Sequence, residues 1–121
     1  MNIVFASDTD LAQLQIKYIV LELDTLRFEN SNQTQTAWCL ISTENLTLQE
    51  LPLVDQYRQL HNNMMRNYKL KNWKYCEDAI EYLMGRWRGE LDSFYVEISN
   101  RLVSFKKIQP DTDWDGSYVK S

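Results

Sequence analysis

Three aspartates near the C-terminus have a spacing that could bind a metal ion. Asp111, Asp113 and Asp115 are followed by Gly116 in the pattern D-x-D-x-D-G, which opens a calcium-binding EF-hand loop. A complete loop needs further oxygen ligands, ending with a bidentate glutamate at the twelfth position. Here the ninth position is Val119, and the twelfth would lie beyond the last residue of the sequence. We therefore expect no specific metal site, and the three carboxylates are only weak calcium candidates.

The same stretch has a structural interpretation, which we favour. Trp114 would pack onto the helical part of the chain as an apolar plug, and Asp115 with Gly116 would form the turn that allows this. Asp111 and Asp113 would then stay in water. Residues 109–121 are accordingly predicted to form a C-terminal anchoring tail.

A basic stretch in the middle of the chain is the second candidate site. Arg66, Lys69, Lys71 and Lys74 alternate with aromatic residues, a pattern that can hold phosphate and stack bases. The net charge of −4 argues against nucleic acid. Cations near the end of a helix also favour its dipole. An acidic protein partner is therefore favoured over nucleic acid, and the aspartate-rich tail is an intramolecular alternative.

The sequence contains little that could support catalysis. The single histidine, His61, has no Cys, Asp or second His at the spacing of a metal site or a catalytic triad, and we expect it at the boundary of the core. Glu22 and Asp24 share one face of a predicted strand, but a solvated strand face explains them equally well. No glycine-rich phosphate loop or zinc-ligand spacing is present. We therefore predict a non-catalytic protein without a cofactor.

The amino-acid composition indicates the class of protein to which these residues belong. The 121 residues, 44% of them hydrophobic and 25% charged, predict one soluble globular domain, residues 1–121. The N-terminus lacks the basic and apolar segments of a signal peptide, and no apolar run is long enough to span a membrane. A cytoplasmic location is expected, with Cys39 and Cys76 as reduced, buried thiols.

The first part of the chain, residues 1–45, has β character. Residues 17–28 alternate between apolar and polar types, and the parity slips near Asp24–Thr25, which indicates a β-bulge. Residues 36–42 are a plausible hairpin partner after the turn at 29–33. Residues 3–5 could add a third strand, and a short helix or turn is possible around 8–15.

Residues 50–108 have helical periodicity. Three apolar stripes with spacings of three and four predict helices over 53–68, 73–87 and 91–105. Asn72 is a candidate N-cap and Gly89 a candidate stop for the second helix. We therefore predict an α+β fold in which an antiparallel hairpin, or a three-stranded sheet, packs on three antiparallel helices.

The boundary between the first two predicted helices resembles a tetratricopeptide (TPR) unit. Such units often place an aromatic residue before the turn, as at Tyr68, and another after it, as at Trp73. They also place a small residue in the second helix, as at Ala79, where bulk would push the helices apart. The resemblance implies one helix–turn–helix unit with a following helix, which is too little for a repeat array.

The C-terminal half also resembles the helical tail that follows the catalytic domain in many bacterial adenylate and guanylate cyclases. The resemblance rests on the order of residues from 67 to 120, ending in Trp114-Asp115-Gly116. It implies an accessory helical module and no catalytic residue, because the cyclase domain is absent from these residues. The whole chain is similar to short proteins of marine cyanobacteria and of their viruses.

The favoured function is therefore a small interaction or accessory protein that recognises a protein partner or a second copy of itself. Aromatic residues make up 12% of the chain, and Trp and Tyr are enriched at protein interfaces. Trp38 and Trp87 join the four basic residues as candidate partner-binding positions. The alternatives are a small calcium- or nucleic-acid-binding module, or an enzyme whose site the sequence does not reveal.

Overall fold

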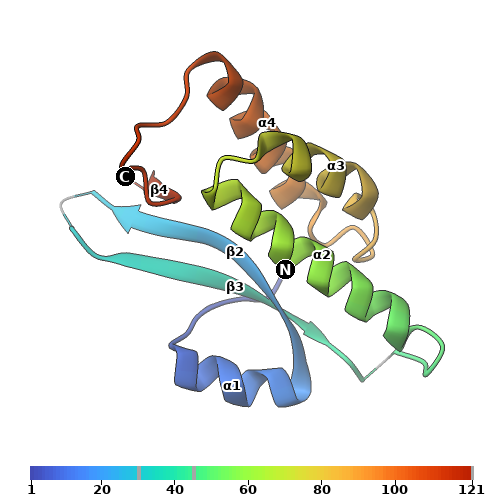
Figure 1. Ribbon diagram of the computed structural model, residues 1–121. Helices are drawn as coiled ribbons and strands as arrows, with labels where there is room; N and C mark the ends of the chain where they lie inside the picture. Colours follow the sequence, from blue (N-terminus) through green and yellow to red (C-terminus); the bar gives the residue numbers. More distant parts are fainter. Residues whose placement is uncertain (30, 45, 121) are drawn as a thin grey trace. The chain divides into compact units, whose positions relative to one another are not determined.

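The computed structural model describes residues 1–29, 31–44 and 46–120 (Figure 1). Within them, helices and a mixed sheet form the α+β fold that the sequence predicts. Residues 30, 45 and 121 lie outside the described residues. They belong to the predicted turn, to the end of the predicted β-rich part and to the end of the predicted tail.

Contacts divide the chain into two compact units. The first contains residues 1–62 together with the C-terminal strand, and the second contains residues 63–116. The boundary therefore falls inside a helix, at Asn62, whereas the sequence pattern placed it between the β-rich and the helical parts. The reason is that the beginning of this helix hydrogen-bonds to the sheet, as described below.

The first unit contains a mixed sheet in the order β1-β3-β2-β4 (Figure 1). Strands β2 (Tyr18–Phe28) and β3 (Thr34–Ser42) form the predicted antiparallel hairpin, and β1 (Ile3–Phe5) is the third strand, antiparallel to β3. The fourth strand, β4 (Ser117–Lys120), lies parallel to β2 and was not predicted from the sequence.

The predicted β-bulge is confirmed. Leu21 pairs with Cys39 and Thr25 pairs with Thr36, and the register shifts between Glu22 and Thr25. The Thr25 and Thr36 hydroxyls lie 3.0 Å apart and hydrogen-bond across the ladder just after the shift. After the shift Thr25 is buried, whereas Leu26 is half-buried and Phe28 is exposed.

Helix α1 (Asp8–Lys17) connects β1 to β2, so of the short helix and the turn left open around 8–15 the helix is the one that forms. Ser7 caps it, because the Ser7 hydroxyl accepts a hydrogen bond from the Asp10 backbone N–H at 3.3 Å. Leu11 is the buried residue of α1, and it packs with Val20 and Leu40. The helix therefore covers the face of the sheet to which these two strand residues point.

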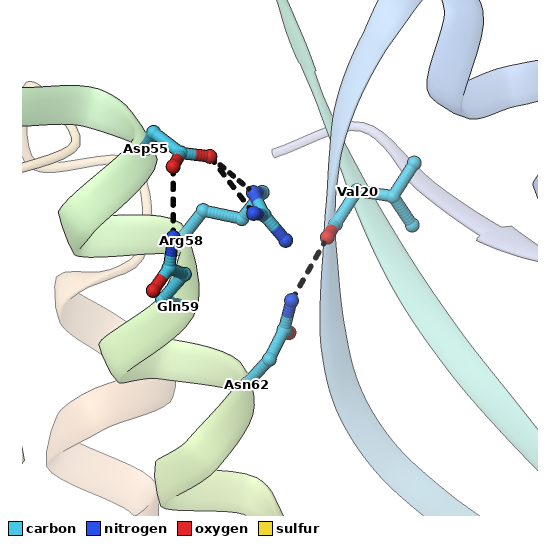
Figure 2. Close-up of polar contacts among 5 residues, drawn as sticks. All are labelled: Val20, Asp55, Arg58, Gln59 and Asn62. Carbon is cyan, nitrogen blue, oxygen red and sulfur yellow. Dashed lines mark hydrogen bonds and ion pairs between the residues drawn. The ribbon is translucent and has the colours of Figure 1, made fainter. Parts of the chain in front are cut away.

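Helix α2 (Leu51–Lys69) begins in the first unit and ends in the second. An exposed polar row lies near its start (Figure 2). There the Asp55 carboxylate accepts hydrogen bonds from Arg58 at 2.8 Å and from Gln59 at 2.8 Å. These bonds lower the pKa of Asp55 from its ordinary value, with the Arg58 bond the larger cause. Because this pair is exposed, it contributes little to stability.

The second unit contains the end of α2 with α3 (Trp73–Leu83) and α4 (Asp92–Lys107). Helix α3 ends earlier than the apolar stripe predicts, at Leu83 rather than near Trp87. Gly85 has a φ of +81°, a left-handed conformation that stops the helix. The Gly85 N–H then donates to the Asp92 carboxylate at 2.8 Å, which holds the connection to α4.

Asn72 precedes α3 as predicted but does not cap it through its side chain. Its amide donates instead to the Asn67 side-chain oxygen at 2.8 Å. The aromatic residues flanking this turn, Tyr68 and Trp73, are both buried, as is Ala79. The antiparallel TPR-like packing of the three helices stays a prediction.

Candidate functional site: a groove beside strand β3

The edge of the sheet at the start of β3 is open. Strand β1 pairs with β3 only as far as Phe5 opposite Ala37, and among the described residues no strand continues this ladder beside Thr34–Thr36. On its other side this segment pairs with β2. Thr34 and Gln35 are exposed, in agreement with a strand that has one neighbour here.

Ladder geometry fixes which backbone groups point to the open side. In an antiparallel ladder, alternate residues hydrogen-bond to the same neighbour. The Leu40 N–H donates to the Asn2 carbonyl at 2.9 Å, and Trp38 pairs with Val4, so the even-numbered residues of β3 point towards β1. Thr34 therefore presents its backbone N–H and C=O groups to the open side, and so does the N–H of Thr36, whereas the Thr36 C=O faces Ala6, the next residue after β1.

The local sequence explains why β1 stops where it does. Ser7 has extended dihedrals (φ −76°, ψ 166°) and caps α1, so the chain must turn out of the strand immediately after Phe5. The turn leaves a groove of about 470 Å³ beside the open edge. Its walls are the strand-to-helix turn and the start of β3, and the lining residues are Phe5, Ala6, Ser7, Asp8, Thr34, Gln35, Thr36 and Trp38.

Trp38 lines this groove and carries an unsatisfied hydrogen-bond donor. The side chain is half-buried, but its indole Nε1 atom is buried and has no hydrogen-bond partner among the described residues. Leaving such a donor unpaired costs about 1–3 kcal/mol, so native proteins rarely do so without a reason.

The opposite edge of the hairpin, on β2, is closed. Strand β4 covers Thr25–Phe28. Before the bulge, Asn62 of α2 takes the place of a strand. Its side chain accepts a hydrogen bond from the Glu22 N–H at 3.0 Å and donates one to the Val20 carbonyl at 3.4 Å, the second of which is shown in Figure 2. Side-chain groups thus satisfy backbone groups that would otherwise form an exposed edge.

His61 completes this closure and is buried, which corrects its predicted place at the core boundary. Its side chain is 0% exposed, and Nε2 lies 2.6 Å from the Glu22 carbonyl. Since a carbonyl only accepts, Nε2 must carry the hydrogen. Burial lowers the pKa of His61 to about 4, against a smaller opposing effect of the Glu22 hydrogen bond. A neutral, enclosed imidazole in this position stabilises the fold.

Two of the four basic residues around the turn from α2 to α3 have partners in the same unit, and one of them, Lys71, is bonded to the tail. The Lys71 ammonium donates to the backbone carbonyls of Pro110 at 3.4 Å and Asp111 at 2.9 Å. Lys74 pairs with Asp78 at 3.1 Å, which raises the pKa of the lysine. The tail therefore meets this stretch as the intramolecular alternative predicts, but through backbone carbonyls rather than aspartate carboxylates.

The tail carries an aromatic side chain at Trp114. Its ring lies 5.4 Å from those of Tyr68 and Phe105 and 6.1 Å from that of Trp73. Gly116 follows with a φ of +85°, and a Cβ there would lie 2.5 Å from Cγ of Lys69. Trp114 thus packs among the aromatic rings of the second unit, and the anchoring role of Trp114, Asp115 and Gly116 stays a prediction.

The three aspartates of the tail point to solvent. Asp111, Asp113 and Asp115 are all exposed. Within residues 1–29, 31–44 and 46–120, no group of three or more His, Cys, Asp or Glu side chains lies close enough together to hold a metal ion.

The two tryptophans predicted to bind a partner, Trp38 and Trp87, differ in their burial. Trp38 lies at the groove, but Trp87 is buried, and its indole N–H donates to the Tyr95 hydroxyl at 3.0 Å. Trp87 is thus a core residue, because the connection after α3 folds it inward. Arg66 remains exposed at the end of α2.

Sequence reasoning missed the groove itself. Asp8, Thr34 and Thr36 were not candidate site residues, because their neighbourhood depends on where the β1 ladder stops. A local signal was present: the spacing of Ser7 and Asp10 marks the helix start that ends β1.

Comparisons of the chain with models of known protein families, with curated proteins and with solved structures find no match. The resemblances to cyclase tails and to TPR units therefore stay predictions. Among the described residues, none of the helices is long and apolar enough to cross a membrane.

Proposed function

We propose that this chain is a non-catalytic interaction protein that binds an extended segment of a protein partner beside β3. The observation that carries the proposal is the groove next to an open strand edge, where Thr34 has no strand neighbour on its open side among the described residues. An extended segment can add a strand to such an edge, with backbone hydrogen bonds supplying affinity.

The groove suits a short segment rather than a folded surface. Its volume of about 470 Å³ is that of a site for a small ligand, whereas stable interfaces between folded proteins bury roughly 1,000 Å² or more. The backbone groups of Thr34 and Thr36 would each contribute about 1 kcal/mol per hydrogen bond. These bonds alone correspond to a Kd of roughly 1 mM or weaker, and ordering a flexible segment offsets part of them, so we expect millimolar to submillimolar affinity once side-chain contacts in the groove are added.

The rival functions have less support. Lys71 and Lys74 are occupied within the second unit, which leaves less of the basic stretch for phosphate. The buried, neutral His61 is enclosed by its contact with β2 and does not line the groove. Protein recognition is therefore the function that the described geometry favours.

The test is the variant Thr34→Pro. Proline lacks the backbone N–H that points to the open side, and the first position of a strand tolerates it. Thr34→Ala is the matched control, because it removes the side chain and keeps the N–H. The whole chain would be used to select binders from a random peptide display library, and Kd values would be measured for synthetic copies.

We expect the wild type and Thr34→Ala to bind the selected peptides and Thr34→Pro to bind them at least about fivefold more weakly, with unchanged circular dichroism. Peptides that bind Thr34→Pro as tightly as the wild type would refute strand addition at this edge. Failure to select any peptide would refute the proposed function as a whole.

A further inference from the structure

We infer that the partner segment carries a lysine or arginine that Asp8 recognises at the end of the groove. This inference rests on the proposed function and names the chemistry of the partner. Asp8 is the one ionisable residue among those that line the groove in the described structure. It is exposed, and it makes no hydrogen bond or ion pair with the other described residues.

The neighbouring acid, Asp10, has a different role. The Ser7 hydroxyl donates to the Asp10 carboxylate at 2.9 Å and accepts from its backbone N–H at 3.3 Å. These bonds cap α1, and Asp10 does not line the groove. Both acids lie in the first turn of α1, where the dipole favours negative charge, but only Asp8 also faces the groove.

Register indicates which residue of the segment should be basic. In register with β1, Ala6 lies opposite Thr36 and packs in the same apolar cluster as Val4 and Trp38, so the first place open to a segment is opposite Thr34. A side chain opposite Thr34 points to the same sheet face as Trp38, because alternate residues of a strand share a face. A long basic side chain at this place can reach the Asp8 carboxylate. The nearest strand cation, Arg27, pairs with Thr34 and does not line the groove.

The same geometry argues against a second copy of the chain as the occupant. If two β3 edges paired antiparallel, Thr34 of one copy would lie opposite Thr36 of the other, and no cation would meet Asp8. Each copy also has a net charge of −4, so like charges would meet at the contact. A partner with a basic extended segment would instead place a cation next to Asp8 and carry a charge opposite to that of this chain.

The experiment compares Asp8→Asn with the matched variant Asp10→Asn in the whole chain. Each removes one negative charge from the first turn of α1, but only Asp8→Asn changes the groove. Peptides selected on the wild type would be sequenced. The tightest would be synthesised with its conserved basic residue and with methionine in its place, and Kd values measured at low and at high salt.

We expect one fixed basic position in the selected peptides, and a Kd about threefold to fivefold weaker for Asp8→Asn, with less than about a twofold change for Asp10→Asn. With the wild type, the methionine peptide should bind more weakly than the basic peptide by the same factor. With Asp8→Asn, replacing the basic residue by methionine should weaken binding no further. High salt should remove the difference in Kd between the wild type and Asp8→Asn. Selected peptides without a basic preference, or equal binding by Asp8→Asn, would overturn this inference. Sensitivity to Thr34→Pro would then still support strand addition, so the two failures can be told apart.

Discussion

Acidification should destabilise this protein through His61 at a pH where most carboxylates are still ionised. The imidazole is 0% exposed, and Nε2 is bonded to the Glu22 carbonyl at 2.6 Å. Burial opposes a positive charge at this place, which lowers the pKa from 6.5 to about 4. In the unfolded chain the same side chain is in water and has its ordinary pKa.

The direction of the effect follows from proton binding. Between the folded pKa of about 4 and the unfolded value of 6.5, the unfolded chain binds more protons at His61 than the folded one does. The free energy of unfolding therefore falls as the pH falls through this window. From these two values the loss is about 2 kcal/mol at roughly pH 5 and approaches about 3 kcal/mol below pH 4. Above roughly pH 7.5 the effect is absent.

Urea unfolding at constant ionic strength measures this loss. His61 is the only histidine in the sequence, so His61→Gln removes the titration while keeping a side chain that can donate to the Glu22 carbonyl. We expect the wild type to lose about 2 kcal/mol more than His61→Gln between roughly pH 7.5 and pH 5. Carboxylates titrate in both proteins and cancel in the difference. Parallel pH profiles for the two proteins would show that the imidazole is not held neutral in the folded state.

Two further predictions concern the second unit and the cysteines. Gly116→Ala should lower the free energy of unfolding by about 1–3 kcal/mol. The reason is that alanine disfavours a φ of +85° and that its Cβ would meet the Lys69 side chain. Unchanged urea unfolding of this variant would contradict the prediction. Cys39 and Cys76 should react with a thiol reagent at roughly pH 8 only after unfolding, since both are buried and burial raises the pKa of Cys76 to about 12. Rapid labelling of the native protein would contradict that expectation.

The hairpin and its bulge could be predicted because local rules determine them. Alternation over 17–28 identifies a strand, and the change of parity near Asp24 requires an extra residue, which the register shift supplies. Around 8–15 the sequence left a helix and a turn open, and the spacing of Ser7 and Asp10 was the local signal for the helix that forms. Each of these signals lies within one element, so a single sequence is enough to read it.

Features that depend on distant partners were missed. Strand β4 is four residues long, too short for alternation to be recognised, and it exists as a strand because β2 offers an edge. The apolar stripe of α3 runs past its true end because Trp87 keeps helical spacing while lying in an irregular connection. Gly85 was the local sign of that end. The burial of His61 likewise depends on β2, some forty residues away in sequence.

The two edges of the hairpin give the strongest argument for a site at β3. On β2, Asn62 supplies one acceptor and one donor to the backbone, and β4 continues beyond the bulge. The same chain leaves Thr34–Thr36 without such cover and places Asp8 beside it. A charge near a strand edge can also protect against edge-to-edge association. The variant Asp8→Asn separates the two roles. If the charge only protects the edge, the variant should self-associate in a concentration-dependent manner. If Asp8 recognises a partner, the variant should stay monomeric and lose the preference for basic peptides.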